Sequence, residues 1–362
     1  MIPYTNFLYF GISLYVAIPS LALGFARRLA PRLSQAWIVL ATAFMLVIQY
    51  ATWQKVSARG AVLALWLVIG YALYEYLLAA GFLALRLRRA SRPVYYLVLL
   101  LALLPLALSR LLPLVSPDSA VWFLGISYLT FRCLDVIICI QDQLISALPP
   151  VQFLAFLLFF PTLSSGPIDR YRRFADDWRR DRTRPEVLRD LDQAVHHIFN
   201  GFLYKFILAA LLQTYVLAPL AVGNQLGRIL GYMYAYSFYL FFDFAGYSAF
   251  AVGFSYLFGI YTPENFNRPF LAPNIQEFWN RWHMSLSFWF RDHVYSRFVF
   301  SALKGRWFKN PRTASYLGFF LSMGLMGVWH GLAARYIFYG LYHAILLVSH
   351  DWLSRWNKQK RL

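Results

Sequence analysis

Long runs of apolar residues follow one another along most of this chain, and they restrict its fold more than any other feature. A helix needs about 20 consecutive apolar residues to cross the hydrocarbon core of a bilayer. The runs place helical spans at residues 4–25, 37–53, 61–85, 95–115, 121–140, 197–222, 230–260, 314–333 and 336–352. The sequence therefore predicts an all-α, polytopic membrane protein with about 9–11 transmembrane helices, together with re-entrant and interfacial helices.

The composition agrees with a membrane protein and argues against a nucleic-acid-binding one. Of the 362 residues, 60% are hydrophobic and 14% are charged, whereas soluble domains average about 45–50% and about 25%. The formal net charge of +18 would indicate nucleic-acid binding in a soluble protein. Here the basic residues lie in short loops between apolar runs, so membrane topology and anionic lipid headgroups explain them. We expect membrane lipids, and no nucleic acid, among the partners.

The basic loops also predict an orientation. Basic residues follow the first and third runs and occupy the tail, at Arg27, Arg28, Arg32, Arg86, Arg88, Arg89, Arg92, Arg355, Lys358, Lys360 and Arg361. Because cytoplasmic loops carry an excess of Lys and Arg, we expect these segments in the cytoplasm and the N-terminus outside. The first run has no basic segment before it and no small-residue cleavage site, so we interpret it as a retained span.

Three segments do not fit a simple crossing. Residues 151–165 are apolar but short and contain Pro161, which is typical of a re-entrant segment. The Arg- and Asp-rich stretch 169–189 predicts an amphipathic helix at the cytoplasmic headgroups, with a solvated loop as the alternative. The run at 230–260 is long for one crossing, so we expect a tilt or a break near Gly246.

Residues 261–300 are interrupted by Pro and Asn, which favours short re-entrant or interfacial helices that enclose a cavity. Among them, FWNRWHMSLSFWF contains His283, and His330 follows in GVWHG. Ionisable groups at membrane depth are usually functional, and histidine is the most frequent general base near neutral pH. We expect both histidines at one buried site, although a structural histidine bonded to a carbonyl is the alternative. Residues that could assist them are Trp279, Asn280, Arg281, Trp282, Ser285, Asp243 and Trp329.

Other chemistries have less support in the residue pattern. A zinc site needs three or four ligands, and the sequence has no HExxH motif, phosphate loop or GxSxG elbow. Cys133 and Cys139 lie in one apolar run and fit no metal spacing, so we interpret them as small buried residues. A proton-coupled transporter, with Asp243, Arg281 and the histidines as a relay, is an alternative of another class. The remaining histidines are expected to be structural or interfacial: His196, His197, His293, His343 and His350.

Several motifs together resemble the membrane-bound O-acyltransferases. The most specific are WNRWHMSLSFWFRDHVY, which begins at Trp279, and GVWHG around His330. Residues 125–132 (GISYLTFR) and 241–248 (FFDFAGYS) are similar to segments of the alginate O-acetylation proteins. Residues 159–174 (FFPTLSSGPIDRYRRF) resemble the D-alanyl transfer branch of the family.

The resemblance implies a fold and two residue roles. The chain would be a single integral-membrane acyltransferase domain over 1–362, with N-terminal spans at 1–120 and a motif-bearing core at 121–335. Its helices would form a ring around a thinner centre. His330 would be the general base, and His283 would be the second histidine of the pair.

The resemblance also implies a donor, an acceptor and a location in the bacterial cytoplasmic membrane. D-alanine would pass from the phosphopantetheine thioester of a small acidic carrier protein to hydroxyls of an envelope polymer or a lipid-linked acceptor. No cofactor or metal would be bound. The candidates for docking the acidic carrier are the basic residues Arg170, Arg172, Arg173 and Arg306. An O-acetyltransferase of the alginate or peptidoglycan type, with the same fold and another donor, is the alternative.

Overall fold

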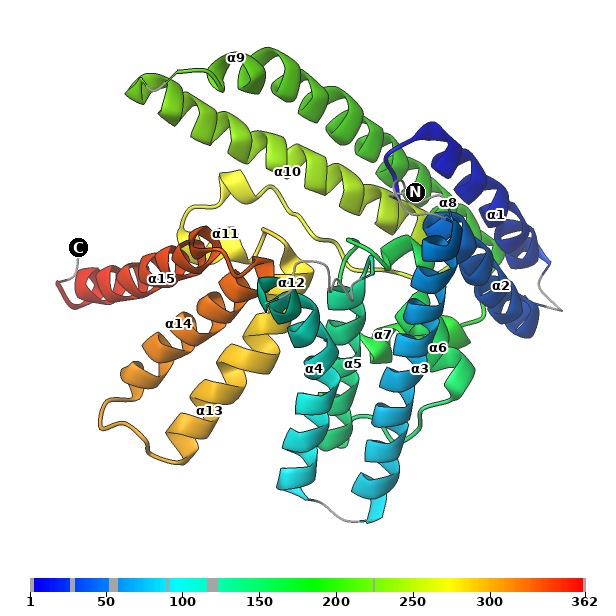
Figure 1. The fold of residues 1–362 in the computed structure, drawn as a ribbon, viewed down its shortest axis with the longest axis horizontal. Coiled ribbons are helices and arrows are strands. Elements are labelled where there is room, and N and C mark those ends of the chain that lie inside the picture. Colours follow the sequence, from blue (N-terminus) through cyan, green and yellow to red (C-terminus); the bar gives the residue numbers. More distant parts are fainter. Residues whose placement is uncertain are drawn as a thin grey trace. The chain divides into compact units, whose positions relative to one another are not determined.

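The structure is a computed structural model that describes residues 3–26, 30–51, 58–88, 91–115, 123–223 and 225–360. Nearly all regular structure in these ranges is helical (Figure 1), which confirms the all-α prediction. An isolated bridge joins Phe266 to Trp282. The chain groups into two compact units. Unit 1 comprises residues 1–106 and 121–264, and unit 2 comprises residues 107–120 and 265–362.

Unit 1 contains most of the long apolar helices. It begins with α1 (Phe7–Phe25), α2 (Ala30–Ala51), α3 (Ala58–Arg88) and α4 (Arg92–Val115), whose residues from 107 onward are grouped with unit 2. Then come α5 (Ile126–Gln141), α6 (Pro150–Leu158), the 3₁₀ turn η1 (Phe160–Thr162) and α7 (Tyr171–Arg179). The unit ends with α8 (Arg184–Phe202), the π-helical segments η2 (Leu203–Ala209) and η3 (Leu212–Leu217), α9 (Ala218–Leu220) and α10 (Leu226–Leu257).

Six helical stretches of the described residues are long and apolar enough to cross a bilayer, as expected for a multi-pass membrane protein. They are Phe7–Phe25, Arg32–Tyr50, Val62–Arg88, Arg92–Pro113, Arg184–Leu220 and Leu226–Leu257. Each overlaps a predicted span. The remaining predicted spans lie in α5, α14 (Pro311–His330) and α15 (Ala334–Lys360), which are helical but shorter or more polar.

The segment after α5 folds as a short helix, as the sequence predicts. Helix α6 has 9 residues, and at about 1.5 Å per residue it is far too short to cross a bilayer. The chain then turns through η1, which contains Pro161. The re-entrant placement of this segment in the membrane stays a prediction.

The sequence predicts one amphipathic helix over the basic stretch 169–189. This prediction is wrong, because the stretch forms two helices with a break between them. Helix α7 buries Tyr171, Phe174, Ala175 and Trp178 on one face. Arg180 then adopts an extended backbone, and a capping box of Thr183 and Glu186 starts α8. Because the capping box satisfies the first free N–H groups of α8, α8 begins here and continues without interruption into the predicted sixth span.

Helix α10 is unbroken from Leu226 to Leu257. Of the two predicted alternatives for this long run, the break near Gly246 is therefore wrong, and the tilt stays a prediction. Gly246 instead allows a close approach between helices. A Cβ at this position would lie 2.8 Å from the backbone nitrogen and the Cβ of Lys205 in η2. The glycine is therefore needed for packing, since nothing larger than hydrogen fits at the contact.

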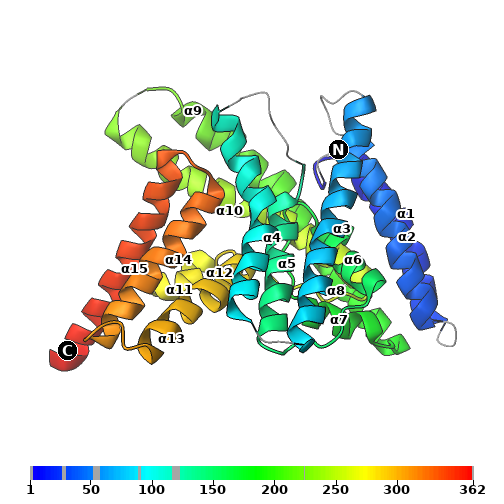
Figure 2. The ribbon, with the colours of Figure 1, turned by 60° about the horizontal axis from the view of Figure 1, so that its bottom comes forward.

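Unit 2 holds the irregular segment and its short helices, as the sequence predicts. Its elements are η4 (Pro269–Leu271), α11 (Ile275–Trp279), α12 (Met284–Phe290), the π-helical η5 (Arg291–Tyr295), α13 (Ser296–Lys304), α14 and α15. Helices α14 and α15 lie side by side (Figure 2). A Cβ on Gly340 would overlap the carbonyl of Met323, and one on Gly327 would overlap the carbonyl of Tyr336. The two backbones are thus in direct contact.

Part of the basis for the predicted orientation lies outside the described residues. The basic residues concerned are Arg27, Arg28, Arg89 and Arg361. Residues 116–122, around the predicted start of the motif-bearing core, also lie outside the described residues.

Candidate functional site

His283 lies in a tight turn that precedes α12. Its backbone has φ 43° and ψ 52°, the left-handed conformation, which costs a non-glycine residue about 1–2 kcal/mol. Asn265 stabilises this turn. Its carbonyl accepts a hydrogen bond from the Met284 N–H at 2.8 Å, and its Oδ1 accepts from the Ser285 hydroxyl at 2.6 Å and the Ser285 N–H at 3.3 Å.

The segment before α11 runs alongside the turn and covers His283. Phe266 and Trp282 form an antiparallel bridge, and the Asn267 N–H donates to the Arg281 carbonyl at 2.9 Å. Trp282 stacks on Phe278 with ring centroids 5.5 Å apart. As a result His283 is 4% exposed.

His330 is the last residue of α14, and the chain turns at Gly331. The indole ring of Trp329 lies near both histidines, with its centroid 4.5 Å from that of His330 and 6.3 Å from that of His283. Tyr336 and Tyr339 also lie near His330, each with its ring centroid 6.1 Å from that of the imidazole. His283 is buried and His330 is exposed, so the pair combines an enclosed histidine with an accessible one.

The other predicted residues of this segment have defined partners. The Asn280 amide donates to Glu277 Oε1 at 3.1 Å, and Arg281 Nε lies 3.6 Å from Glu277 Oε2. Ser285 is bonded to Asn265, as described above. Trp279 packs edge-to-face on His343 of α15, with ring centroids 5.0 Å apart. Aromatic rings lie beside the histidines, those of Phe266 and Trp329 at His283 and that of Trp329 at His330.

Asp243 belongs to unit 1. It forms an ion pair with Lys205, which joins α10 to η2 at the contact made by Gly246. Lys205 is the partner that sequence reasoning missed. The signal was a single lysine in an otherwise apolar run, because an isolated charge at membrane depth requires a counter-charge.

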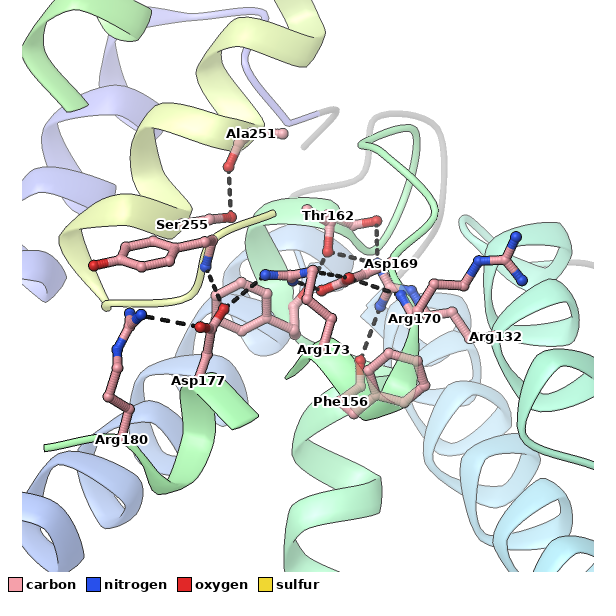
Figure 3. Close-up of polar contacts among 12 residues, drawn as sticks. Arg132, Phe156, Thr162, Asp169, Arg170, Arg173, Asp177, Arg180, Ala251 and Ser255 are labelled. Carbon is pink, nitrogen blue, oxygen red and sulfur yellow. Dashed lines mark hydrogen bonds and ion pairs between the residues drawn. The ribbon is translucent and has the colours of Figure 1, made fainter. Parts of the chain in front are cut away.

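The three arginines proposed for carrier docking in residues 170–173 differ in their surroundings. Arg170 lies 2.5 Å from Asp135, and Arg173 forms ion pairs with both Asp169 and Asp177 (Figure 3). Arg172 alone among them is exposed. Two of the three thus help to hold the fold of unit 1.

Asp177 connects this network to the end of α10. Its Oδ2 accepts a hydrogen bond from the Tyr261 N–H at 2.7 Å and lies 2.6 Å from Arg173 Nη1. Burial raises the pKa of the Asp177 carboxyl, whereas the Tyr261 N–H and the Arg173 guanidinium lower it. Arg180 lies over the ring of Tyr261, 3.9 Å from its centroid. These contacts fix the break between α7 and α8.

Arg132 organises the turn after α6, and sequence reasoning missed it. Its side chain is fully buried and donates to the carbonyls of Phe156, Leu157 and Thr162 at 2.9–3.0 Å and to the Thr162 hydroxyl at 2.5 Å (Figure 3). These acceptors lie where the short helix ends, so the guanidinium satisfies carbonyls that the helix leaves free. An arginine inside the apolar run 125–140 was the available signal.

Arg306 lies in unit 2, exposed, in the turn after α13. Large apolar side chains around it are also exposed, namely Phe300, Leu303 and Trp307. Lys304 and Lys309 are exposed beside it. This surface therefore combines positive charge with apolar area.

Among the residues that the structure describes, no group of three or more His, Cys, Asp or Glu side chains could hold a metal ion. Cys133 and Cys139 are both free thiols.

Comparison with known proteins identifies relatives along almost the whole chain. The family described as MBOAT, membrane-bound O-acyltransferase, matches residues 34–361. The teichoic acid D-alanyltransferase of Bacillus subtilis (strain 168) is 45% identical over 369 aligned positions, which cover 99% of this chain and 90% of that protein. The Streptococcus thermophilus protein of the same name is 45% identical, over 79% of this chain and 71% of its own length. A probable alginate O-acetylase AlgI of Pseudomonas aeruginosa is 33% identical, over 62% and 42%.

Proposed function

The chain belongs to the membrane-bound O-acyltransferase family and is a membrane acyltransferase, and from that premise we propose that it transfers D-alanine to hydroxyls of a teichoic-acid-type envelope polymer. The observation that carries this proposal is the 45% identity to a teichoic acid D-alanyltransferase across 99% of the chain. The arrangement of the two histidines supports this proposal. The indole of Trp329 lies beside both the accessible base His330 and the enclosed imidazole of His283.

His330 acts as the general base. It removes the proton from an acceptor hydroxyl while the oxygen attacks the carbonyl carbon of a D-alanyl thioester. The new C–O bond forms, the C–S bond breaks, and the proton held by His330 passes to the departing sulfur, so that an ester and a free thiol result. General-base catalysis of this kind contributes about 10²–10⁴-fold to a rate.

His283 positions the thioester carbonyl or stabilises the negative charge that develops on its oxygen. Its burial supports this role, since hydrogen bonds to a developing oxyanion are worth more where water is excluded. Asn280, a further candidate for the same task, already donates to Glu277. We therefore assign oxyanion stabilisation to His283 and to the indole N–H of Trp329.

The donor is the phosphopantetheine thioester of a small acidic carrier protein, of the type that serves DltB-like enzymes. Arg172 and the surface around Arg306 are the basic positions available to dock it, because both arginines are exposed. Complementary charge steers such encounters and fixes their orientation. With these surfaces in the bacterial cytoplasm, the N-terminus lies outside and the C-terminus inside.

An O-acetyltransferase acting on an envelope polysaccharide is the second candidate. The observation in its favour is the 33% identity to a probable alginate O-acetylase, which covers 62% of this chain. The donor group distinguishes the two functions.

The test is transfer by the purified protein in lipid nanodiscs from a carrier loaded with labelled D-alanine or with labelled acetate. We expect D-alanine and not acetate to reach a glycerol-phosphate polymer. His330→Ala should lose about 10²–10⁴-fold in rate, and His283→Ala should also lose much of its rate. His196→Ala is the control and should act as wild type, because the His196 side chain in α8 is 70% exposed. Normal turnover by the His330 variant would refute the mechanism, and exclusive acetyl transfer would refute the donor.

A further inference from the structure

The polar ring atoms in unit 2 that are buried without a hydrogen-bond partner include Nε1 of Trp279 and Nδ1 of His343. The two rings touch edge-to-face, with centroids 5.0 Å apart, and Trp279 is 6% exposed. Buried donors and acceptors in folded proteins nearly always bond to protein, water or a ligand. Two such atoms on touching side chains therefore indicate a site for a polar group from outside the chain.

This pair lies close to the catalytic histidine. Tyr339 precedes His343 by one helical turn of α15, and its ring centroid is 4.5 Å from that of His343 and 6.1 Å from that of His330. Trp279 ends α11, directly before the turn that carries His283. A molecule that extends from His330 across Tyr339 thus reaches Trp279 and His343.

The two atoms have complementary hydrogen-bonding roles. The indole N–H of Trp279 can only donate, and Nδ1 of His343 accepts when the imidazole proton is on Nε2. Phosphate and carboxylate oxygens only accept, so with His343 in this tautomer they would leave it without a partner, and an ammonium group would leave Trp279 without one. Secondary amides offer both a carbonyl and an N–H. The faces of Tyr339 and Trp279 also supply apolar surface for methylene groups.

The proposed acyl donor carries such amides at a suitable distance. In a pantetheine arm, two methylene groups separate the thioester sulfur from the first amide, which places that amide about 5 Å from the reacting carbon when the arm is extended. A thioester beside His330 would therefore extend its arm along Tyr339 toward the pair.

We propose that Trp279 and His343 form a binding site for the amides of the pantetheine arm, with the Trp279 N–H bonded to an amide carbonyl and His343 Nδ1 bonded to an amide N–H. This proposal rests on the proposed function, because it takes a pantetheine thioester as the donor. It assigns a binding role to His343, which the sequence predicts to be structural or interfacial.

The test uses three D-alanyl thioesters of equal length. The first is the N-acetylcysteamine thioester, which contains one amide. In the second, a methylene replaces the amide N–H and leaves a ketone, and in the third, methylenes replace both the N–H and the carbonyl. Transfer is measured with the purified full-length protein in nanodiscs. For the wild type we expect kcat/KM to fall about fivefold to tenfold at each of the two steps, as for the loss of one buried hydrogen bond.

Each variant should abolish one step and keep the other. Trp279→Phe should have equal kcat/KM for the ketone and the alkane donor. His343→Phe should have equal kcat/KM for the amide and the ketone donor. The differences should appear in KM more than in kcat, because the contact lies away from the reacting carbon and is the same in ground and transition states. Trp289→Phe, at another buried tryptophan of unit 2, should keep both steps.

If both variants still show the two decreases in kcat/KM that the wild type shows, the proposal is overturned and the pair binds only water or an acceptor hydroxyl. A wild type that shows neither step would overturn it as well. If Trp279→Phe does not fold, His343→Phe alone decides, through the amide-to-ketone step. A wild type that uses these thioesters but takes nothing from a loaded carrier would instead refute the carrier as donor.

Discussion

Replacement of Asn265 tests how the fold holds His283 in place. The Oδ1 atom of Asn265 accepts hydrogen bonds from the hydroxyl and the N–H of Ser285 at 2.6 and 3.3 Å, directly after the left-handed residue His283. Asn265→Ala removes both bonds but keeps the backbone carbonyl that accepts from the Met284 N–H. The variant therefore weakens the turn without removing any group proposed to touch the substrate.

The expected effect follows from two opposing terms. A buried hydrogen bond contributes about 0.5–1.5 kcal/mol, so the two bonds together contribute about 2 kcal/mol. The left-handed backbone of His283 costs about 1–2 kcal/mol. Once the bonds are lost, the cost of this conformation is no longer offset and the turn relaxes. Because about 1.4 kcal/mol corresponds to a factor of ten, we expect kcat/KM for D-alanyl transfer to fall about tenfold to thirtyfold.

The assay is transfer of labelled D-alanine from loaded carrier at limiting and saturating donor. Asn265→Asp, which keeps an Oδ1 acceptor, should retain most activity. Ser285→Ala removes the donor of the shorter bond, so the double variant should lose less than the two single variants combined. Asn200→Ala, at an exposed asparagine of α8, is the matched control. Activity of Asn265→Ala within twofold of wild type, or full additivity with Ser285→Ala, would refute the reasoning.

Three further predictions concern stability, measured as the midpoint of thermal unfolding in nanodiscs. Arg132→Met should destabilise unit 1 by about 3–5 kcal/mol, because four acceptors around the fully buried guanidinium lose their donor; an unchanged midpoint would contradict this. Gly246→Ala should lower the midpoint, because its Cβ would lie 2.8 Å from the Lys205 nitrogen. The control Gly81→Ala, whose Cβ would have no atom within 4 Å, should raise stability by about 0.5–1 kcal/mol. Equal effects of the two substitutions would show that the close approach at Gly246 is unimportant. Glu75→Leu should raise the midpoint, because the cost of burying the carboxyl exceeds what its contacts with Tyr71 and Cys133 return, and a lower midpoint would show that these contacts stabilise unit 1.

Apolar runs predicted most helices of this protein, because a helix in a bilayer has to be apolar over its length. They could not predict how a helix packs. Gly246 suggested a break, yet its role depends on the close approach of η2, and the π-helical turns of η2 and η3 have no signature in hydropathy. The start of α8 was readable in principle, since Thr183 and Glu186 have the spacing of a capping box.

The residues around the histidines were predictable in identity but not in partners. The sequence indicates His283 and His330 because they are ionisable groups in apolar surroundings. It does not indicate that Asn280 and Arg281 pair with Glu277, since these pairings depend on how the short helix α11 ends. The sequence could not indicate a binding role for His343, because Trp279, whose ring it contacts, belongs to α11, a separate segment of the chain.

The direct backbone contact between Gly327 and Gly340 has a consequence for motion during turnover. We expect α14 and α15 to move as one body, because their backbones meet at these glycines and separation would open a void between them. This body carries His330 at the end of one helix and His343 on the other. We expect a rearrangement in unit 2 that admits a donor or releases a product to involve the segment 265–284, whose helical residues are 269–271, 275–279 and 284 and whose His283 has a left-handed backbone. The accessible histidine is on the fixed side of the site, and the enclosed histidine is on the side that can move.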